Sequence, residues 1–310
     1  MILSVSRRTD IPNYYSDWFF NRIKEGFLYV RNPMNHHQVS KILLDKDIVD
    51  CIVFWTKNPS KMIPRLSELI GYAYYFQYTL TGYDKSIEKQ VPDIDESIRI
   101  FRELSSKVGK DKVIWRYDPI FINEKYTLSS QIERFCYILD SIASYTNTCI
   151  ISFIDMYVKN TSRLRDIRQL TNDEMIEFSK VISKVAEKYE INVKTCSEKV
   201  NLEYFHIQHG SCIDKQMIED IIGCQINGKK DSGQRLECGC LESRETGSYN
   251  SCPNGCIYCY ANYDEVTVMN NIKKHDVNSP LLIGDITKED NISLPKLKSS
   301  KNLQYDLFDL

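Results

Sequence analysis

The stretch Cys51-Ile52-Val53-Phe54-Trp55-Thr56-Lys57-Asn58-Pro59 combines an apolar run with an abrupt polar end. An unbroken run of five apolar or aromatic residues is typical of a strand buried on both faces, as in a parallel sheet. The polar residues and the proline that follow indicate the start of a loop. This stretch therefore predicts a buried parallel strand with polar groups at its carboxyl end.

Similar runs recur along the chain and are separated by stretches with helical periodicity. The predicted strands cover residues 2–6, 51–56, 73–79, 112–117, 149–154 and 191–195. The predicted helices cover residues 16–25, 59–69, 93–108, 128–144 and 172–189, the last with Thr171 as its N-cap. This alternation predicts an α/β fold, a full or partial (β/α) barrel, over residues 1–205.

Charged side chains follow several predicted strands directly. They are Arg7, Arg8, Asp10, Lys57, Arg116, Asp118 and Asp155. In (β/α) barrels the loops after the strands form the active site, so these groups predict a polar pocket. Each of them also has a structural interpretation, as a helix cap, a turn former or an ion pair at the rim of the barrel.

Bulk composition excludes some partner classes. The 310 residues include 40 basic and 42 acidic ones, a formal net charge of −2, so no overall charge attracts nucleic acid or an anionic membrane. No apolar run reaches the length of a membrane span, and the start of the chain reads as a strand, so we expect a cytoplasmic protein without membrane contact. Eleven cysteines in a reducing compartment favour metal ligation over disulfides.

The cysteines fall into three groups. Cys51, Cys136 and Cys149 lie in apolar or helical patterns and are predicted to be buried small hydrophobic residues. The other eight all follow residue 195. Of these, Cys252, Cys256 and Cys259 form the loop Cys252-Pro-Asn-Gly-Cys256-Ile-Tyr-Cys259-Tyr260-Ala261. Three thiols are one short of a closed zinc or iron–sulfur site, which leaves a coordination position open.

This loop resembles that of the radical S-adenosylmethionine (radical SAM) superfamily, and its flanking residues are similar to those of spore photoproduct lyase-type proteins. The resemblance implies a [4Fe-4S] cluster on Cys252, Cys256 and Cys259, with SAM bound to the fourth iron. It also implies reductive cleavage of SAM and an electron donor such as ferredoxin or flavodoxin. A structural zinc knuckle is the alternative interpretation of the same cysteines.

The strand-end phrases and the cysteines together resemble a bacterial family of unknown function, DUF1848, from residue 1 to about residue 284. In ordinary radical SAM enzymes the cluster loop follows the first barrel strand, whereas here it follows the last predicted one. The resemblance therefore implies either a circularly permuted barrel or a C-terminal segment folded over its mouth. Thr56-Lys57, similar to a phrase in the photoproduct-lyase branch, favours permutation.

The same resemblance implies roles for the strand-end groups. Arg7, Arg8, Lys57 and Arg116 would bind the carboxylate of SAM or an anionic substrate. Asp10, Asp118 and Asp155 would bind ribose hydroxyls or the amino group of SAM. Tyr258 and Tyr260 would shield the cluster or relay an electron. DNA or a nucleotide is one expected substrate.

A second cysteine group lies between the last predicted strand and the three-cysteine loop, mostly in the segment 206–284, which we expect to pack on the barrel mouth. Cys196, Cys212, Cys238 and Cys240 suffice for a second [4Fe-4S] cluster or a zinc site, with Cys224, His206 or His209 as alternates. Such a loop-rich segment is commonly stabilised by metal.

Residues 285–310 are expected to form a flexible tail, and Gln304–Phe308 within it is similar to peptides that bind the bacterial sliding clamp. Two further functions stay open at this point. One is a non-enzymatic, zinc- or cluster-stabilised protein associated with nucleic acid, and the other is a two-cluster electron-transfer protein.

Overall fold

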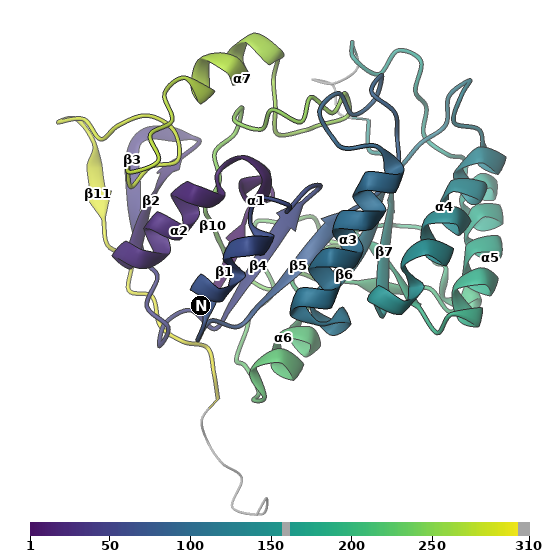
Figure 1. Cartoon of the computed structure of the whole chain (residues 1–310), viewed down its shortest axis with the longest axis horizontal. Helices are drawn as coiled ribbons and strands as arrows, with labels where there is room; N and C mark the ends of the chain where they lie inside the picture. Colours follow the sequence, from purple (N-terminus) through teal and green to yellow (C-terminus); the bar gives the residue numbers. More distant parts are fainter. Residues whose placement is uncertain (157–161, 303–310) are drawn as a thin grey trace, which may run out of the picture.

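The structure is a computed structural model that describes residues 1–156 and 162–302. Within these residues, eight parallel strands form the main sheet in the order β10-β1-β4-β5-β6-β7-β8-β9 (Figure 1). The strands are β1 (Ile2–Val5), β4 (Cys51–Thr56), β5 (Tyr74–Thr79), β6 (Val113–Ile120), β7 (Thr148–Phe153), β8 (Asn192–Cys196), β9 (Gln208–Gly210) and β10 (Arg244–Glu245). The six strands predicted from the sequence are confirmed, and β9 and β10 are additional.

Helices connect most of these strands. They are α1 (Ile11–Tyr14), α2 (Ser16–Glu25), α3 (Ile94–Val108), α4 (Leu128–Ile142), α5 (Asn172–Lys188), α6 (Lys215–Ile222) and α7 (Glu265–Ile272). The predicted N-cap of α5 is confirmed, because Thr171 and Glu174 form a reciprocal capping box. The helix predicted over residues 59–69 is instead a 3-10 helix, Ile63–Leu69, whose first turn contains Pro64. Because proline has no amide hydrogen, Pro64 cannot donate the backbone hydrogen bond that an α-helix starting at residue 59 would require.

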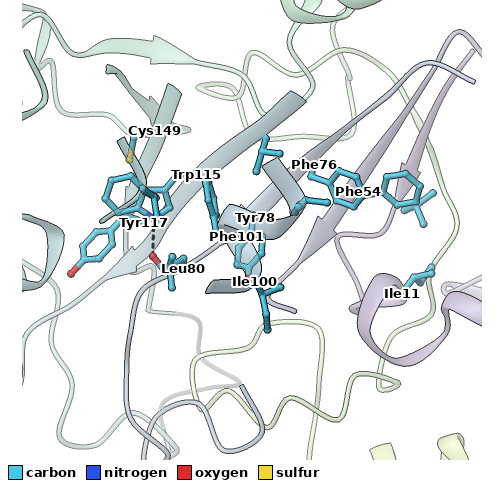
Figure 2. Close-up of a cluster of buried hydrophobic side chains, with 14 of the residues drawn as sticks. Ile11, Phe54, Phe76, Tyr78, Leu80, Ile100, Phe101, Trp115, Tyr117 and Cys149 are labelled. Carbon is cyan, nitrogen blue, oxygen red and sulfur yellow. Dashed lines mark hydrogen bonds between the residues drawn. The ribbon is translucent and has the colours of Figure 1, made fainter. Parts of the chain in front are cut away.

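One face of the sheet packs against helices α2 to α5 and forms the main hydrophobic core. Alternate strand residues such as Phe54, Phe76 and Trp115 point into this core, and Figure 2 shows several of them together. The ring of Phe54 stacks on that of Phe76 with centroids 4.8 Å apart, and the indole nitrogen of Trp115 donates to the carbonyl of Leu80 at 2.8 Å. We call the face of the sheet that packs on these helices the outer face.

The opposite, inner face changes from apolar to polar along the strands. Near the amino ends it presents Ile2, Val53, Tyr75, Ile114 and Ile150, which pack against apolar residues of the segment 212–241. Toward the carboxyl ends of β4 to β8, the inward positions carry Trp55, Gln77, Arg116, Ser152 and Cys196. Because side chains alternate with a period of two, this inner face collects polar groups at the carboxyl end of the sheet.

The sheet does not close into a barrel. In the strand order of the described residues, β10 and β9 are the two edges and do not pair with each other. With bounds of Gln208–Gly210 and Arg244–Glu245, both strands are too short for a full ladder. The full barrel, one of the two predicted forms, is therefore not found, and the architecture is an open parallel α/β sheet.

The segment 211–241 lies between the two edges. It crosses the inner face, and the amide of Leu241 donates to the carbonyl of Ile213 at 3.1 Å. This hydrogen bond connects the chain just after β9 to the chain just before β10. The gap that a closed barrel would fill with strand pairing is therefore filled by this segment.

A small second sheet lies beside α2. It consists of the hairpin β2 (Phe27–Asn32) and β3 (Asn35–Leu43), with β11 (Asn291–Ser293) paired parallel to β3. β11 belongs to residues 285–302, within the segment expected to be flexible, and Asp290 there forms an ion pair with Arg31. None of the helices in the described ranges has the length and apolar character needed to cross a membrane.

We predict that Phe54→Ala destabilises the protein by about 3–5 kcal/mol, because it removes a buried ring from between Phe19 and Phe76. Tyr204, an aromatic residue that is 89% exposed, provides the control, and Tyr204→Ala should change the free energy of unfolding by less than about 0.5 kcal/mol. Urea unfolding of both variants measures the difference. Equal effects would contradict this description of the core.

Candidate functional site

A cavity of about 540 Å³ opens at the carboxyl ends of the main-sheet strands. Every residue of the main predicted sets lines it, whereas the alternates Cys224, His206 and His209 do not, and the roles of all of them stay predictions. The lining residues include Arg7, Arg8, Asp10, Lys57, Arg116, Asp118, Asp155, Tyr258, Tyr260, Cys196, Cys212, Cys238, Cys240, Cys252, Cys256 and Cys259. Another hollow of about 650 Å³, between α5 and the 3-10 helix Glu203–Phe205, is lined by no cysteine.

The three-cysteine loop follows β10 and is held by hydrogen bonds to its backbone. The side-chain amide of Asn262 donates to the carbonyl of Cys252 at 2.7 Å, and the Tyr15 hydroxyl donates to the carbonyl of Ser251 at 2.6 Å. Gly255, between the first two cysteines, has φ +66°, and a Cβ there would lie 3.1 Å from the Lys89 side chain. The loop therefore needs glycine at this turn.

Asp10 connects this loop to the sheet. Its carboxylate accepts hydrogen bonds from the Thr56 hydroxyl at 2.7 Å, the Lys57 amide at 2.8 Å and the Asn254 side chain at 3.2 Å. It also caps α1 through the amide of Asn13. Burial raises the pKa of Asp10, although these donors act in the opposite direction. With its oxygens committed to these donors, Asp10 positions Lys57 and the cysteine loop.

Glu88 is a buried residue of the site that sequence reasoning missed. Its carboxylate is 2% exposed and accepts hydrogen bonds from Lys57 at 2.8 Å, from the Thr81 hydroxyl at 3.0 Å and from the hydroxyl of Tyr258. Its backbone bridges to that of Cys256. Glu88 lies in a loop without a recognisable motif, so only its contacts identify it.

Arg116 lies on the inner face between the sheet and the second cysteine group. Its guanidinium forms an ion pair with Asp118, donates to the sulfur of Cys212 at 2.6 Å and lies 5.3 Å from the ring centroid of Trp55. Asp118 also accepts from the hydroxyl of Ser152. The charge of Arg116 is therefore directed at a carboxylate and a sulfur, deep in the cavity.

The other predicted groups also have partners. Arg7 donates to the Ser243 hydroxyl at 3.2 Å and lies near Glu245, and Tyr260 donates to the carbonyl of Arg7 at 2.7 Å. Arg8 donates to the carbonyl of Gly247 at 3.3 Å.

At the rim, Asp155 forms an ion pair with Arg235 at 2.5 Å. Glu198 follows β8 nearby and was also missed by sequence reasoning. It accepts from the amide of Phe153 at 2.8 Å, and burial raises its pKa to about 8, with the charges of Asp155 and Asp118 acting in the same direction. Glu198 is thus a protonatable carboxyl group beside the cavity near neutral pH.

Charged side chains of both signs surround the cavity. The cationic lining residues are Arg7, Arg8, Lys57, Arg116 and Arg235, and the lining carboxylates are Asp10, Asp118 and Asp155. Glu88 beside Lys57 and Glu245 beside Arg7 bring the carboxylates to the same number as the cations. Arg8 donates to the carbonyl of Gly247 instead of a carboxylate, which leaves its guanidinium charge suited to a carboxylate or a phosphate.

The thiols fit a thiophilic metal in number and chemistry but are not yet arranged around one. In the part of the chain that the structure describes, no group of three or more His, Cys, Asp or Glu side chains has the arrangement of a metal site. Burial raises the pKa of the Cys252 thiol to about 12 and raises that of the Cys256 thiol well above its usual range. Metal binding there would release protons and turn the side chains inward.

The tail hypothesis is not addressed by the structure, because Gln304–Phe308, the peptide predicted to bind a sliding clamp, lies outside the described residues.

Comparisons with known proteins give a family without an assigned activity. The model of a family described as a domain of unknown function, DUF1848, matches residues 2–261. No curated protein matches. Among solved structures, the chain is similar to the crystal structure of a putative alpha-L-fucosidase from Bacteroides thetaiotaomicron, with 13% identity over 62% of this chain and 72% of that one. The TM-score is 0.26, so this likeness carries no functional argument.

We predict that Glu88→Ala destabilises the protein by about 3 kcal/mol, because it leaves Lys57, whose side chain is 13% exposed, without its carboxylate partner. The control is Glu265→Ala, which removes the partner of Lys89 in an exposed pair beside the same loop and should cost less than about 1 kcal/mol. Urea unfolding measures both. If the two variants were equally stable, Glu88 would not hold the site together.

Proposed function

The chain belongs to the DUF1848 family, and we propose that this protein is a radical SAM-type iron–sulfur enzyme in which Cys252, Cys256 and Cys259 hold a [4Fe-4S] cluster. The observation that carries the proposal is the meeting of this loop with the polar strand ends in one cavity. Three thiols at the carboxyl end of a parallel sheet offer an incomplete ligand set beside room for a small molecule.

The position of the loop in the sheet supports the same proposal. The loop follows β10, which is last among the strands of the main sheet in sequence but is an edge strand in space, next to β1. A radical SAM barrel carries its cluster loop after its first strand. A circular permutation that moves the first strand to the end of the chain would give the order β10-β1-β4 seen here.

Charge around the loop is a further support. Lys57 lines the cavity together with Cys256 and would lie near the thiolates of an anionic cluster, while Glu88, which also accepts from Tyr258, fixes the position of its ammonium group. When bound, such a cluster supplies an electron, taken from a ferredoxin- or flavodoxin-type donor, that cleaves SAM to methionine and a 5′-deoxyadenosyl radical. The tasks of the chain itself are to bind, to orient and to exclude water.

The cationic wall of the cavity would carry the binding task. Arg7 and Arg8, at the end of β1, could hold the carboxylate of SAM or an anionic substrate, whereas Arg116, expected from the sequence to share this role, faces Asp118 and Cys212. We infer an anionic substrate, such as a nucleotide or DNA, from the two guanidinium groups of Arg7 and Arg8 on this wall. Asp118 positions Arg116 through their ion pair, and Asp10 positions the cysteine loop through Asn254.

We predict that anaerobically reconstituted and reduced protein gives an electron paramagnetic resonance signal that changes when SAM is added. Only a cluster with an open coordination position can bind SAM, so a second, closed cluster would add a constant signal. Cys256→Ala should abolish the SAM-dependent part. Cys136→Ala, on the far side of the sheet in α4, should retain it.

A cluster signal that is indifferent to SAM would contradict the enzyme and favour electron transfer. Zinc in the place of iron at Cys252, Cys256 and Cys259 would favour a metal-stabilised binding protein. Circular dichroism of the Cys256→Ala variant checks that the loss of signal is not a loss of fold.

A further inference from the structure

The second cysteine group gathers thiols from both edges of the open sheet. Cys196 ends β8, Cys212 follows β9, and Cys238 and Cys240 precede β10. The sulfurs of Cys196 and Cys212 are 3.0 Å apart. The amide of Ile213, next to Cys212, donates to the sulfur of Cys240 at 3.4 Å, and Cys238 lines the same cavity. Four thiols thus gather in one part of the cavity.

Buried hydrogen bonds hold this cluster in place. The hydroxyl of Tyr75 and the side-chain amide of Gln77, both on the inner face of β5, donate to the carbonyl of Cys212 at 2.7 and 2.8 Å. Both side chains are almost completely buried. Two buried donors on one carbonyl fix the position of the Cys212 backbone. A cysteine that only fills space as a small apolar residue does not require its backbone to be fixed in this way.

Donors also point at the sulfur atoms themselves. Arg116 donates to the sulfur of Cys212 at 2.6 Å, and the amide of Ile213 donates to the sulfur of Cys240 at 3.4 Å. Guanidinium and amide donors stabilise sulfur as a thiolate, and such donors around the ligands are typical of thiolate metal centres. A guanidinium against a neutral thiol would gain little from the contact.

We propose that Cys196, Cys212, Cys238 and Cys240 form a closed four-thiolate metal site that fastens the two edges of the sheet together. The shared ligand chemistry suits one zinc ion or one [4Fe-4S] cluster. Four thiolates around either centre are net negative, and Arg116 is the buried cation beside them. Because all four ligands come from the protein, this centre leaves no position for SAM.

The spacing of the sulfurs requires a small rearrangement to bind zinc and a larger one to bind a [4Fe-4S] cluster. Tetrahedral zinc with bonds of about 2.3 Å separates its sulfurs by roughly 3.8 Å, so Cys196 and Cys212 would turn apart from 3.0 Å. Rotation about χ1 of the cysteines is sufficient for such a change. A disulfide between these two residues is the competing arrangement, and it would leave Cys238 and Cys240 unexplained.

The architecture explains why a metal is placed here. The segment 211–241 contributes one short helix and a few apolar residues to the inner face, and among the described residues the two edge strands are not paired with each other. A metal bound to β8, to the chain after β9 and to the chain before β10 would replace the missing strand pairing. Cys224, which is outside the cluster, follows α6 and is not required.

The experiment uses the full chain carrying Cys252→Ala, Cys256→Ala and Cys259→Ala, so that its outcome does not depend on the proposed enzyme. Zinc chloride, or ferrous iron with sulfide, is added to the reduced protein under anaerobic conditions, and bound metal is measured by mass spectrometry after desalting. We expect about one zinc or about four irons per chain, whichever metal the site prefers. Adding Cys238→Ser and Cys240→Ser should abolish this binding, whereas adding Cys136→Ser should not.

Alkylation of the loaded triple variant provides a readout that does not depend on a further mutant folding. Cys196, Cys212, Cys238 and Cys240 should be protected by metal and labelled after chelation, while Cys224 should label in both states. Absence of bound metal in the triple variant, or unprotected thiols in the loaded protein, would overturn the proposal. So would a Cys196–Cys212 disulfide in protein kept under reducing conditions.

Discussion

The hydrogen bond from the amide of Leu241 to the carbonyl of Ile213 joins the two edges of an otherwise open sheet, and the positions of the cavity cysteines depend on that junction. The chain before it has left β9, and the chain after it enters β10 and then the three-cysteine loop. Beside this junction, the apolar residues of the crossing segment cover the inner face, and β10 pairs with β1, so that the loop begins next to β1. The same crossing segment therefore completes the core and builds one wall of the site.

The inner face explains why the same strands both support the hydrophobic core and carry the side chains of the site. Its amino-terminal half carries Val53, Tyr75 and Ile114 against the crossing segment, and its carboxyl-terminal half carries Arg116 and Cys196 toward the cavity. Period-two alternation places both sets on one side of the sheet while the other side packs on the helices. The packed apolar side chains near the amino ends of the strands support the cavity, and the polar groups converge on it at the carboxyl ends.

The central strands and the site residues could be predicted from the sequence because each strand is a buried apolar run with a polar end, as Cys51–Thr56 shows. The edge strands could not, because Arg244 and Glu245 have no apolar pattern, and their pairing with Leu3 and Ser4 appears only in the folded chain. Glu88 was missed for a similar reason, since its role comes from contacts that the loop makes in three dimensions. The cysteine spacing predicted two groups of thiols, but only the fold brings both into one cavity.

The central claim is that two separate sets of thiols in this cavity each bind metal. Anomalous X-ray diffraction from crystals of anaerobically reconstituted protein, recorded above and below the iron and zinc edges, tests it most directly. The account predicts two resolved metal centres. One would lie among Cys252, Cys256 and Cys259 and contain iron, and the other would lie among Cys196, Cys212, Cys238 and Cys240. The absence of an anomalous scatterer from one set of sulfurs, or from both, would contradict it.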